Sequence, residues 1–140
     1  MPNTSGVSYC NPPGAPPVQG MYSHVARMQP GEIAFIAGQV AVDASGNTLG
    51  VGDFGRQVQQ VFENLGAILR DLGATFESVV QFTTYLTDAG SIPAWMSARA
   101  VLFPRLFASG AYPPNTLLVV SRLVKPEFLI EVEAIARLPA

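Results

Sequence analysis

The last quarter of the chain constrains the fold most strongly, because apolar residues alternate there with a period of two. Between Phe128 and Arg137 every second residue is apolar, and the intervening positions include the carboxylates Glu131 and Glu133. This period predicts a β-strand with one face on a hydrophobic core. The apolar run Leu117–Val124 predicts a second strand, and residues 125–127, with a central proline, predict the tight turn that joins the two.

The other face of the final strand allows two interpretations. It combines the two carboxylates with Leu129 and Ile135, which is too apolar for an ordinary solvated surface. One interpretation is a solvated sheet edge. In the other, a second subunit covers this face and the carboxylates line a cleft between subunits.

Composition limits the class of protein. The 140 residues predict one domain with a single core. With 49% hydrophobic and only 13% charged residues, we expect part of the apolar surface to be hidden in an oligomer. No apolar run approaches the ~18 residues of a membrane span. A net charge of -2 without a basic cluster argues against nucleic acid as a partner.

The only cysteine, Cys10, excludes an internal disulfide and a cysteine-based zinc site. The N-terminus lacks the basic and apolar segments of a secretory signal, so we expect a cytoplasmic protein. Residues 1–20 are rich in proline and predict an extended or flexible lead-in, and residues 21–140 predict the single domain.

Within this domain, Met21–Met28 and Glu32–Val42 predict a hairpin around a turn at residues 29–31. The segment Phe54–Leu72 has helical apolar spacing, with Asp53 as its N-cap.

Residues 77–87 alternate as a strand, and a second helix is expected from Ile92 to Phe103, ended or kinked by Pro104. The order β-β-α-β-α-β-β predicts an α+β fold, in which two helices pack on one face of a mixed sheet.

Two short motifs resemble the C-terminal signature of the Rid family, the YjgF-type reactive intermediate/imine deaminases. Residues 113–116 read Pro-Pro-Asn-Thr where the family has Pro-Ala-Arg-Ser/Thr, and residues 131–136 match its Glu-x-Glu-Ala-x-Ala pattern. The resemblance extends from about Gly20 to Leu138. It implies a chorismate-mutase-like fold, a homotrimer with substrate clefts between subunits, and cofactor-free hydrolysis of enamines and imines to a carbonyl compound and ammonia.

The same resemblance implies the site residues. Glu131 corresponds to the glutamate that handles the attacking water, and Tyr22 to the aromatic residue that covers the substrate. Substrate-binding positions are Asn115, Thr116, Tyr112, Gly38 and Gln39, although Ala37 replaces the serine that precedes the glycine in the family. Simpler roles remain open: Tyr22 could pack the sheet edge, Gly38 could mark a bulge, and Glu131 could form an ion pair between subunits.

Asn115 is the main departure from the family pattern, because an arginine there grips the substrate carboxylate. Loss of such a contact costs ~2–3 kcal/mol, or ~30–150-fold in binding. Either another cation, such as Arg122, Arg99, Arg27 or Lys125, reaches the carboxylate, or the substrate differs from the archetypal 2-iminoacids. We favour a different substrate.

A 2-aminomuconate-type deaminase in aromatic catabolism is one alternative, and a non-catalytic trimer that binds a small metabolite is another. The sequence contains no metal-ligand cluster and no cofactor motif, so we expect no cofactor. For the single histidine, His24, a structural role is the simpler interpretation, and an acid–base role stays open.

Overall fold

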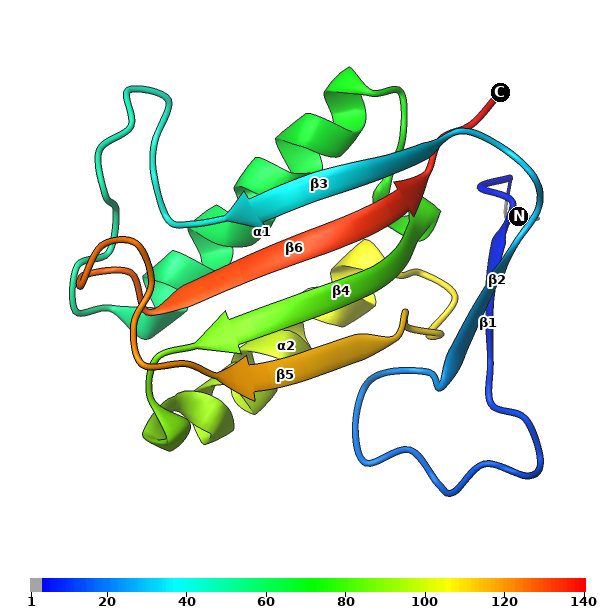
Figure 1. Cartoon of the computed structure of the whole chain (residues 1–140), viewed down its shortest axis with the longest axis horizontal. Coiled ribbons are helices and arrows are strands. Elements are labelled where there is room, and N and C mark those ends of the chain that lie inside the picture. Colours follow the sequence, from blue (N-terminus) through cyan, green and yellow to red (C-terminus); the bar gives the residue numbers. More distant parts are fainter. Residues whose placement is uncertain (1–3) are drawn as a thin grey trace.

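Two helices lie against one face of a four-stranded sheet in the computed structural model, which describes residues 4–140 (Figure 1). The first three residues of the predicted lead-in, including Pro2, lie outside the described range. In chain order the elements are β1 (Val7–Cys10), β2 (Val25–Met28), β3 (Ile33–Gln39), α1 (Phe54–Asp71), a 3₁₀ turn (Phe76–Ser78), β4 (Val79–Leu86), a second 3₁₀ turn (Ala89–Ser91), α2 (Ile92–Leu106), β5 (Asn115–Val119) and β6 (Ile130–Arg137). The predicted α+β fold class is confirmed, with β1 as an additional strand.

The sheet order is β3-β6-β4-β5, so the two strands of the last quarter are not neighbours. The prediction of a tight turn between them is therefore wrong: β4 lies between β5 and β6 (Figure 1). The connection crosses the end of β4, where the Val120 N–H donates to the Leu86 carbonyl and the Thr87 N–H donates to the Leu129 carbonyl. Strand β5 runs parallel to β4 because α2 forms the crossover between them.

The predicted N-terminal hairpin is also wrong. Strand β2 pairs with β1 in a separate two-stranded sheet, and β3 pairs with β6. Part of the lead-in is thus packed on the domain, since Val7 is only 3% exposed and the Tyr9 hydroxyl donates to the Val79 carbonyl at 2.6 Å.

Helix α1 begins as its sequence predicts, because the Asp53 carboxylate accepts a hydrogen bond from the Arg56 N–H at 3.0 Å. Helix α2 differs from the prediction: it continues through Pro104 to Leu106. Proline removes one backbone bond near the helix end, and the burial of Phe103 and Phe107, at 0% and 1% exposure, offsets that loss.

The core lies between the sheet and the helices. Aromatic rings pack around Phe103 at centroid distances from 5.4 to 6.2 Å: Phe62, Trp95 and Phe107 meet it edge-to-face, and Phe82 lies tilted against it. From β6 the predicted apolar face points into this core, with residues 130, 132, 134 and 136 all buried.

Within residues 4–140, no helix covers the opposite face of the sheet, which Figure 1 shows toward the viewer. On it Ile33, Phe35 and Leu118 are 42%, 78% and 40% exposed. We call this the open face. Among residues 4–140, no helix has both the length and the apolar content to cross a membrane.

Candidate active site

The side chain of Glu131 lies over the backbone of Gly38. Glu131 belongs to β6, and Gly38 to the neighbouring strand β3, at a register shift between Ile36 and Gln39. A Cβ atom at position 38 would lie 2.5 Å from Oε2 of Glu131. Any larger residue at position 38 would therefore push the Glu131 side chain out of its place, and the irregular strand brings this backbone and this acid together.

The surroundings of Glu131 keep its proton bound to higher pH than in water. Burial raises the pKa of Glu131, and the nearby Glu133 raises it further. Within residues 4–140, no hydrogen bond or salt bridge engages the Glu131 carboxylate. The group is thus available to a water molecule or a substrate.

Glu133, in contrast, is engaged. The Tyr85 hydroxyl donates to its Oε1 at 2.6 Å, and this hydrogen bond, with burial, raises the pKa of Tyr85. Tyr85 is also the cross-strand partner of Glu131 on β4. The open face therefore carries one occupied and one free carboxylate, with a phenol beside them.

Of two further predicted residues, Thr116 shares the open face with this group, whereas Gln39 pairs with a core-facing residue of β6. Thr116 of β5 is the register partner of Thr83, which in turn pairs with Glu133, so all three share one row on the open face. Gln39 follows the register shift on β3 opposite Val132, and its side-chain amide donates to the Ala37 carbonyl at 3.1 Å.

Asn115 lies on the helix-covered face. Its Oδ1 accepts a hydrogen bond at 3.0 Å from the hydroxyl of Thr84, which is 0% exposed. Asn115 pairs with Phe82, whereas Glu131 pairs with Tyr85 from the other side of β4. A single chain therefore does not bring Asn115 and Glu131 together.

Tyr112 packs against Phe103 and Phe107 at centroid distances of 5.8 and 6.0 Å, at the margin of the core. Tyr22 lies in the segment before β2, where its hydroxyl accepts from the Gln19 N–H at 3.1 Å. The Tyr22 ring meets His24 edge-on at 5.9 Å.

A ring nitrogen of His24 lies 2.6 Å from the Pro16 carbonyl oxygen, and this contact agrees with a structural role. The hydrogen bond and the ring contact of Tyr22 are thus within its own segment, and neither involves Glu131.

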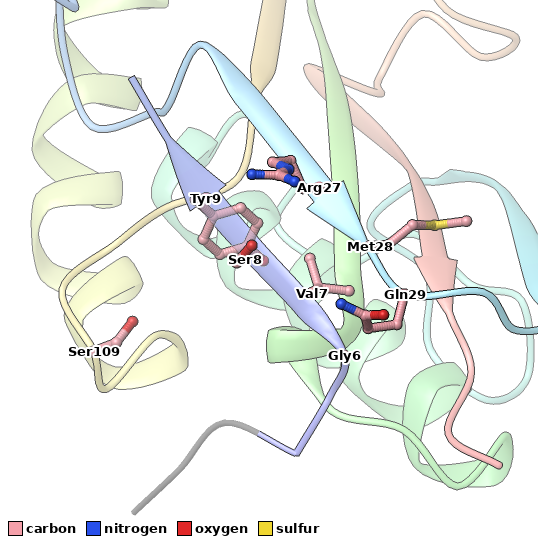
Figure 2. A pocket seen from close by; sticks show the side chains of 8 residues that line it. All are labelled: Gly6, Val7, Ser8, Tyr9, Arg27, Met28, Gln29 and Ser109. Carbon is pink, nitrogen blue, oxygen red and sulfur yellow. The ribbon is translucent and has the colours of Figure 1, made fainter. Parts of the chain in front are cut away.

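Two hollows on the surface differ in their position relative to the site. One, of about 290 Å³, lies on the open face and includes Phe35, Gln81, Thr83 and Glu133 among its lining residues. A larger one, of about 530 Å³, lies at the N-terminal two-stranded sheet, with walls from β1, β2 and the segment after α2 that carries Ser109 (Figure 2). Glu131 lines neither hollow, and of the residues that the sequence suggested for the site the larger hollow includes only the candidate cation Arg27.

Sequence reasoning missed Tyr85, although its position in the β4 alternation places it on the face of the carboxylates. No sequence signal indicated that Arg99 is buried. No group of three or more His, Cys, Asp or Glu residues within the described range is arranged to hold a metal ion.

The fold and this carboxylate-bearing open face define an α+β protein of the chorismate-mutase-like class. The family model described as Endoribonuclease L-PSP matches residues 13–138. A RutC family protein of Pyrococcus abyssi is 34% identical over 122 residues, which cover 87% of this chain and 90% of that one. The chain is also 29% identical to a 3-aminoacrylate deaminase, RutC, of Acinetobacter baylyi, over 89% of this chain and 93% of that one.

Solved structures agree. The crystal structure of YyfB, a Rid-family protein of unknown function from Yersinia pestis, superposes with a TM-score of 0.84 at 35% identity and covers 95% of this chain and 99% of that one. The YjgF gene product of Escherichia coli, with a TM-score of 0.67, 24% identity and coverage of 94% and 98%, has the same fold. The chain belongs to the Rid (YjgF/RutC) family.

Proposed function

We propose that this protein is a Rid-type hydrolytic deaminase that converts an enamine or imine and water into a carbonyl compound and ammonia. An enamine is first protonated on carbon, which gives an iminium ion. Water adds to the iminium carbon, and one of its protons moves to nitrogen. The C–N bond then breaks as the hydroxyl loses its remaining proton and the carbonyl forms, which returns the proton taken up by the enamine. Glu131 is the group that takes the proton from water and returns it to the leaving nitrogen.

The free carboxylate of Glu131 carries the proposal. A general acid–base catalyst works best when its pKa lies near the working pH, and burial moves the pKa of Glu131 in that direction. The Gly38 backbone beneath it leaves no side chain between this carboxylate and an adjacent ligand.

We further propose that the active unit is a homotrimer with its sites in clefts between subunits. The apolar side chains of the open face, Phe35 above all, support this, because an exposed apolar face of a sheet is typical of an interface. Asn115 and Tyr22 do not meet Glu131 within one chain, so a composite site needs a second copy.

The substrate class follows from Asn115 and from the relatives. An amide cannot supply the charge of the family arginine, so we expect weak activity on the archetypal 2-iminoacids. The name of the Acinetobacter relative adds 3-aminoacrylate as a candidate beside 2-aminomuconate, and both are enamines that bear carboxylates.

The test is ammonia release from freshly generated 2-iminoacids, 3-aminoacrylate and 2-aminomuconate, with wild type, Glu131→Gln and Asn115→Arg compared. We expect release from an enamine by wild type, its loss in Glu131→Gln, and a gain on 2-iminoacids in Asn115→Arg. Glu32→Gln is the matched control, because that carboxylate is exposed and lies outside the sheet.

Full activity of Glu131→Gln would refute the assigned role. A small metabolite that binds tightly and is recovered unchanged would instead favour the non-catalytic binding trimer, which the loss of the arginine motivates.

A further inference from the structure

The proposed chemistry leaves one feature unexplained: a buried arginine. Arg99 is 5% exposed and lies on the buried side of α2 with Trp95 and Phe103. A guanidinium stays charged at physiological pH, and a charge removed from water is normally paired with an opposite charge.

No such pair exists within residues 4–140. Among the described residues, Nε of Arg99 has no hydrogen-bond partner, and the guanidinium donates only to the Met96 thioether, a weak acceptor, at 2.9 Å. Burial lowers the pKa of Arg99, and the only group that opposes this electrostatically is the Tyr22 phenol. The charge is therefore uncompensated.

A second buried donor adjoins it. Trp95 is 0% exposed, and its indole Nε1 also lacks a partner. The guanidinium carbon of Arg99 lies 5.8 Å from the centre of the Trp95 ring, and the two residues are one turn apart on α2. Buried donors are nearly always satisfied in native proteins, so two neighbouring unsatisfied donors indicate a missing acceptor. An oxyanion would satisfy them and also neutralise the charge.

The guanidinium lies directly beneath Gly20. This residue is exposed, and a Cβ atom at position 20 would lie 2.8 Å from a guanidinium nitrogen of Arg99. A glycine backbone thus separates the charge from solvent on this side, and Tyr22 follows two residues later.

We propose that Arg99 and Trp95 form an anion subsite beneath residues 19–24, and that it holds a carboxylate of the substrate. The second half of this statement rests on the proposed function. A single guanidinium matches the planar fork of a carboxylate. The cation is thus supplied by α2, on the same covered side of the sheet as the neutral Asn115. It binds the carboxylate of the substrate next to Tyr22.

Trp95 is the only tryptophan of the chain, so its fluorescence reports on the subsite. The full-length protein is titrated with pyruvate, with its neutral amide, and with inorganic phosphate. We expect saturable quenching by pyruvate alone. Arg99→Met should weaken pyruvate binding about 10–150-fold, the range for one lost charge-assisted hydrogen bond. Arg105→Met, at an exposed arginine of the same helix, should leave it unchanged.

Three results would overturn the subsite: no response of wild type to pyruvate, equal affinity in Arg99→Met, or a response to phosphate alone. Gly20→Ala adds an independent test, because its methyl group presses on the guanidinium and should also weaken pyruvate binding.

Thermal unfolding separates a ligand-binding role from a structural one. Replacement of buried charged groups by well-packed apolar residues of similar volume often leaves the stability of the folded protein unchanged or raises it. We therefore expect anion-free Arg99→Met to unfold at or above the wild-type temperature, and pyruvate to stabilise wild type but not the variant. A lower unfolding temperature of Arg99→Met without any pyruvate effect on wild type would make Arg99 structural.

Kinetics distinguish failure of the subsite from failure of the deaminase. On a carboxylate-bearing enamine, Arg99→Met should raise KM more than it lowers kcat, whereas Glu131→Gln should abolish turnover and keep pyruvate affinity. If wild type releases no ammonia but binds pyruvate through Arg99, the deaminase proposal fails alone. If Arg99→Met deaminates with unchanged KM, the subsite proposal fails alone.

Discussion

The two faces of the central sheet come from the same strands and differ in almost every physical respect. The helix-covered face packs into an aromatic core, where Phe82 of β4 meets Phe103 and Trp95 of α2, all at 1% exposure or less. The open face puts Phe35, 78% exposed, beside Glu131, Glu133 and Tyr85. A surface that mixes exposed rings with partly desolvated carboxylates is suited to an interface with a ligand site, whereas the covered face is suited to stability. The two faces should therefore respond differently to the same substitution.

The largest effect is expected from the covered face. Phe103→Ala removes a fully buried ring that contacts the other core aromatics, and should lower the free energy of unfolding by about 3–5 kcal/mol. Phe35→Ala deletes the same side chain from the open face and should change the stability of the single chain by no more than about 0.5 kcal/mol. Urea unfolding of both variants at low protein concentration measures the two changes in the free energy of unfolding. Equal losses in the two variants would contradict the prediction.

Association between copies of the chain should depend on the open face and not on the covered face. In the homotrimer proposed above, Phe35→Asp would remove a ring whose burial between subunits is worth about 1.5–3 kcal/mol and put a charge in its place, so this variant should not form the oligomer. Sedimentation or light scattering over a dilution series gives the mass. Val101→Asp, at an exposed apolar position on α2, is the control and should keep the wild-type mass. An unchanged mass for Phe35→Asp would mean that the open face is not the interface.

A smaller effect is expected where the two carboxylate-bearing strands meet. Gly38→Ala forces a methyl group against the Glu131 side chain and should cost about 1–3 kcal/mol of stability, as overpacking does. The double variant Gly38→Ala, Glu131→Ala should recover most of this loss, because the clashing atoms are gone. Chemical denaturation of wild type, the two single variants and the double variant gives the four free energies of unfolding. If the losses of the two single variants simply added in the double variant, the contact between Gly38 and Glu131 would be contradicted.

The smallest effect is a pH dependence. Burial raises the pKa of Glu131 in the folded chain, so between the unfolded and the folded pKa the folded state binds more protons. The free energy of unfolding therefore falls as the pH rises through this interval, and the folded chain is more stable below the interval than above it. Glu131→Gln should lack this part of the slope in unfolding experiments from about pH 4 to pH 7. Glu32→Gln, at an exposed carboxylate outside the sheet, should follow wild type.

Much of the fold could be read from local patterns. The alternation of β6 and β4, the stripe of α1 and its cap at Asp53 all appear where the sequence predicts them, because side-chain period and capping depend on residues close in the chain. For Pro104 the local rule failed, since buried Phe103 and Phe107 hold the last turn of α2 together.

For the candidate site, the sequence by itself determined which residues of β6 share a face, and so that Glu131 and Glu133 lie off the core. Only the tertiary structure decided which strands are neighbours: periodicity identifies faces but not partners, and β4 rather than β5 came to lie beside β6. Tertiary contacts likewise placed Gly38 under Glu131 and left Arg99 buried without a counter-charge. Burial and pairing depend on segments far apart in the chain, and no local pattern records them.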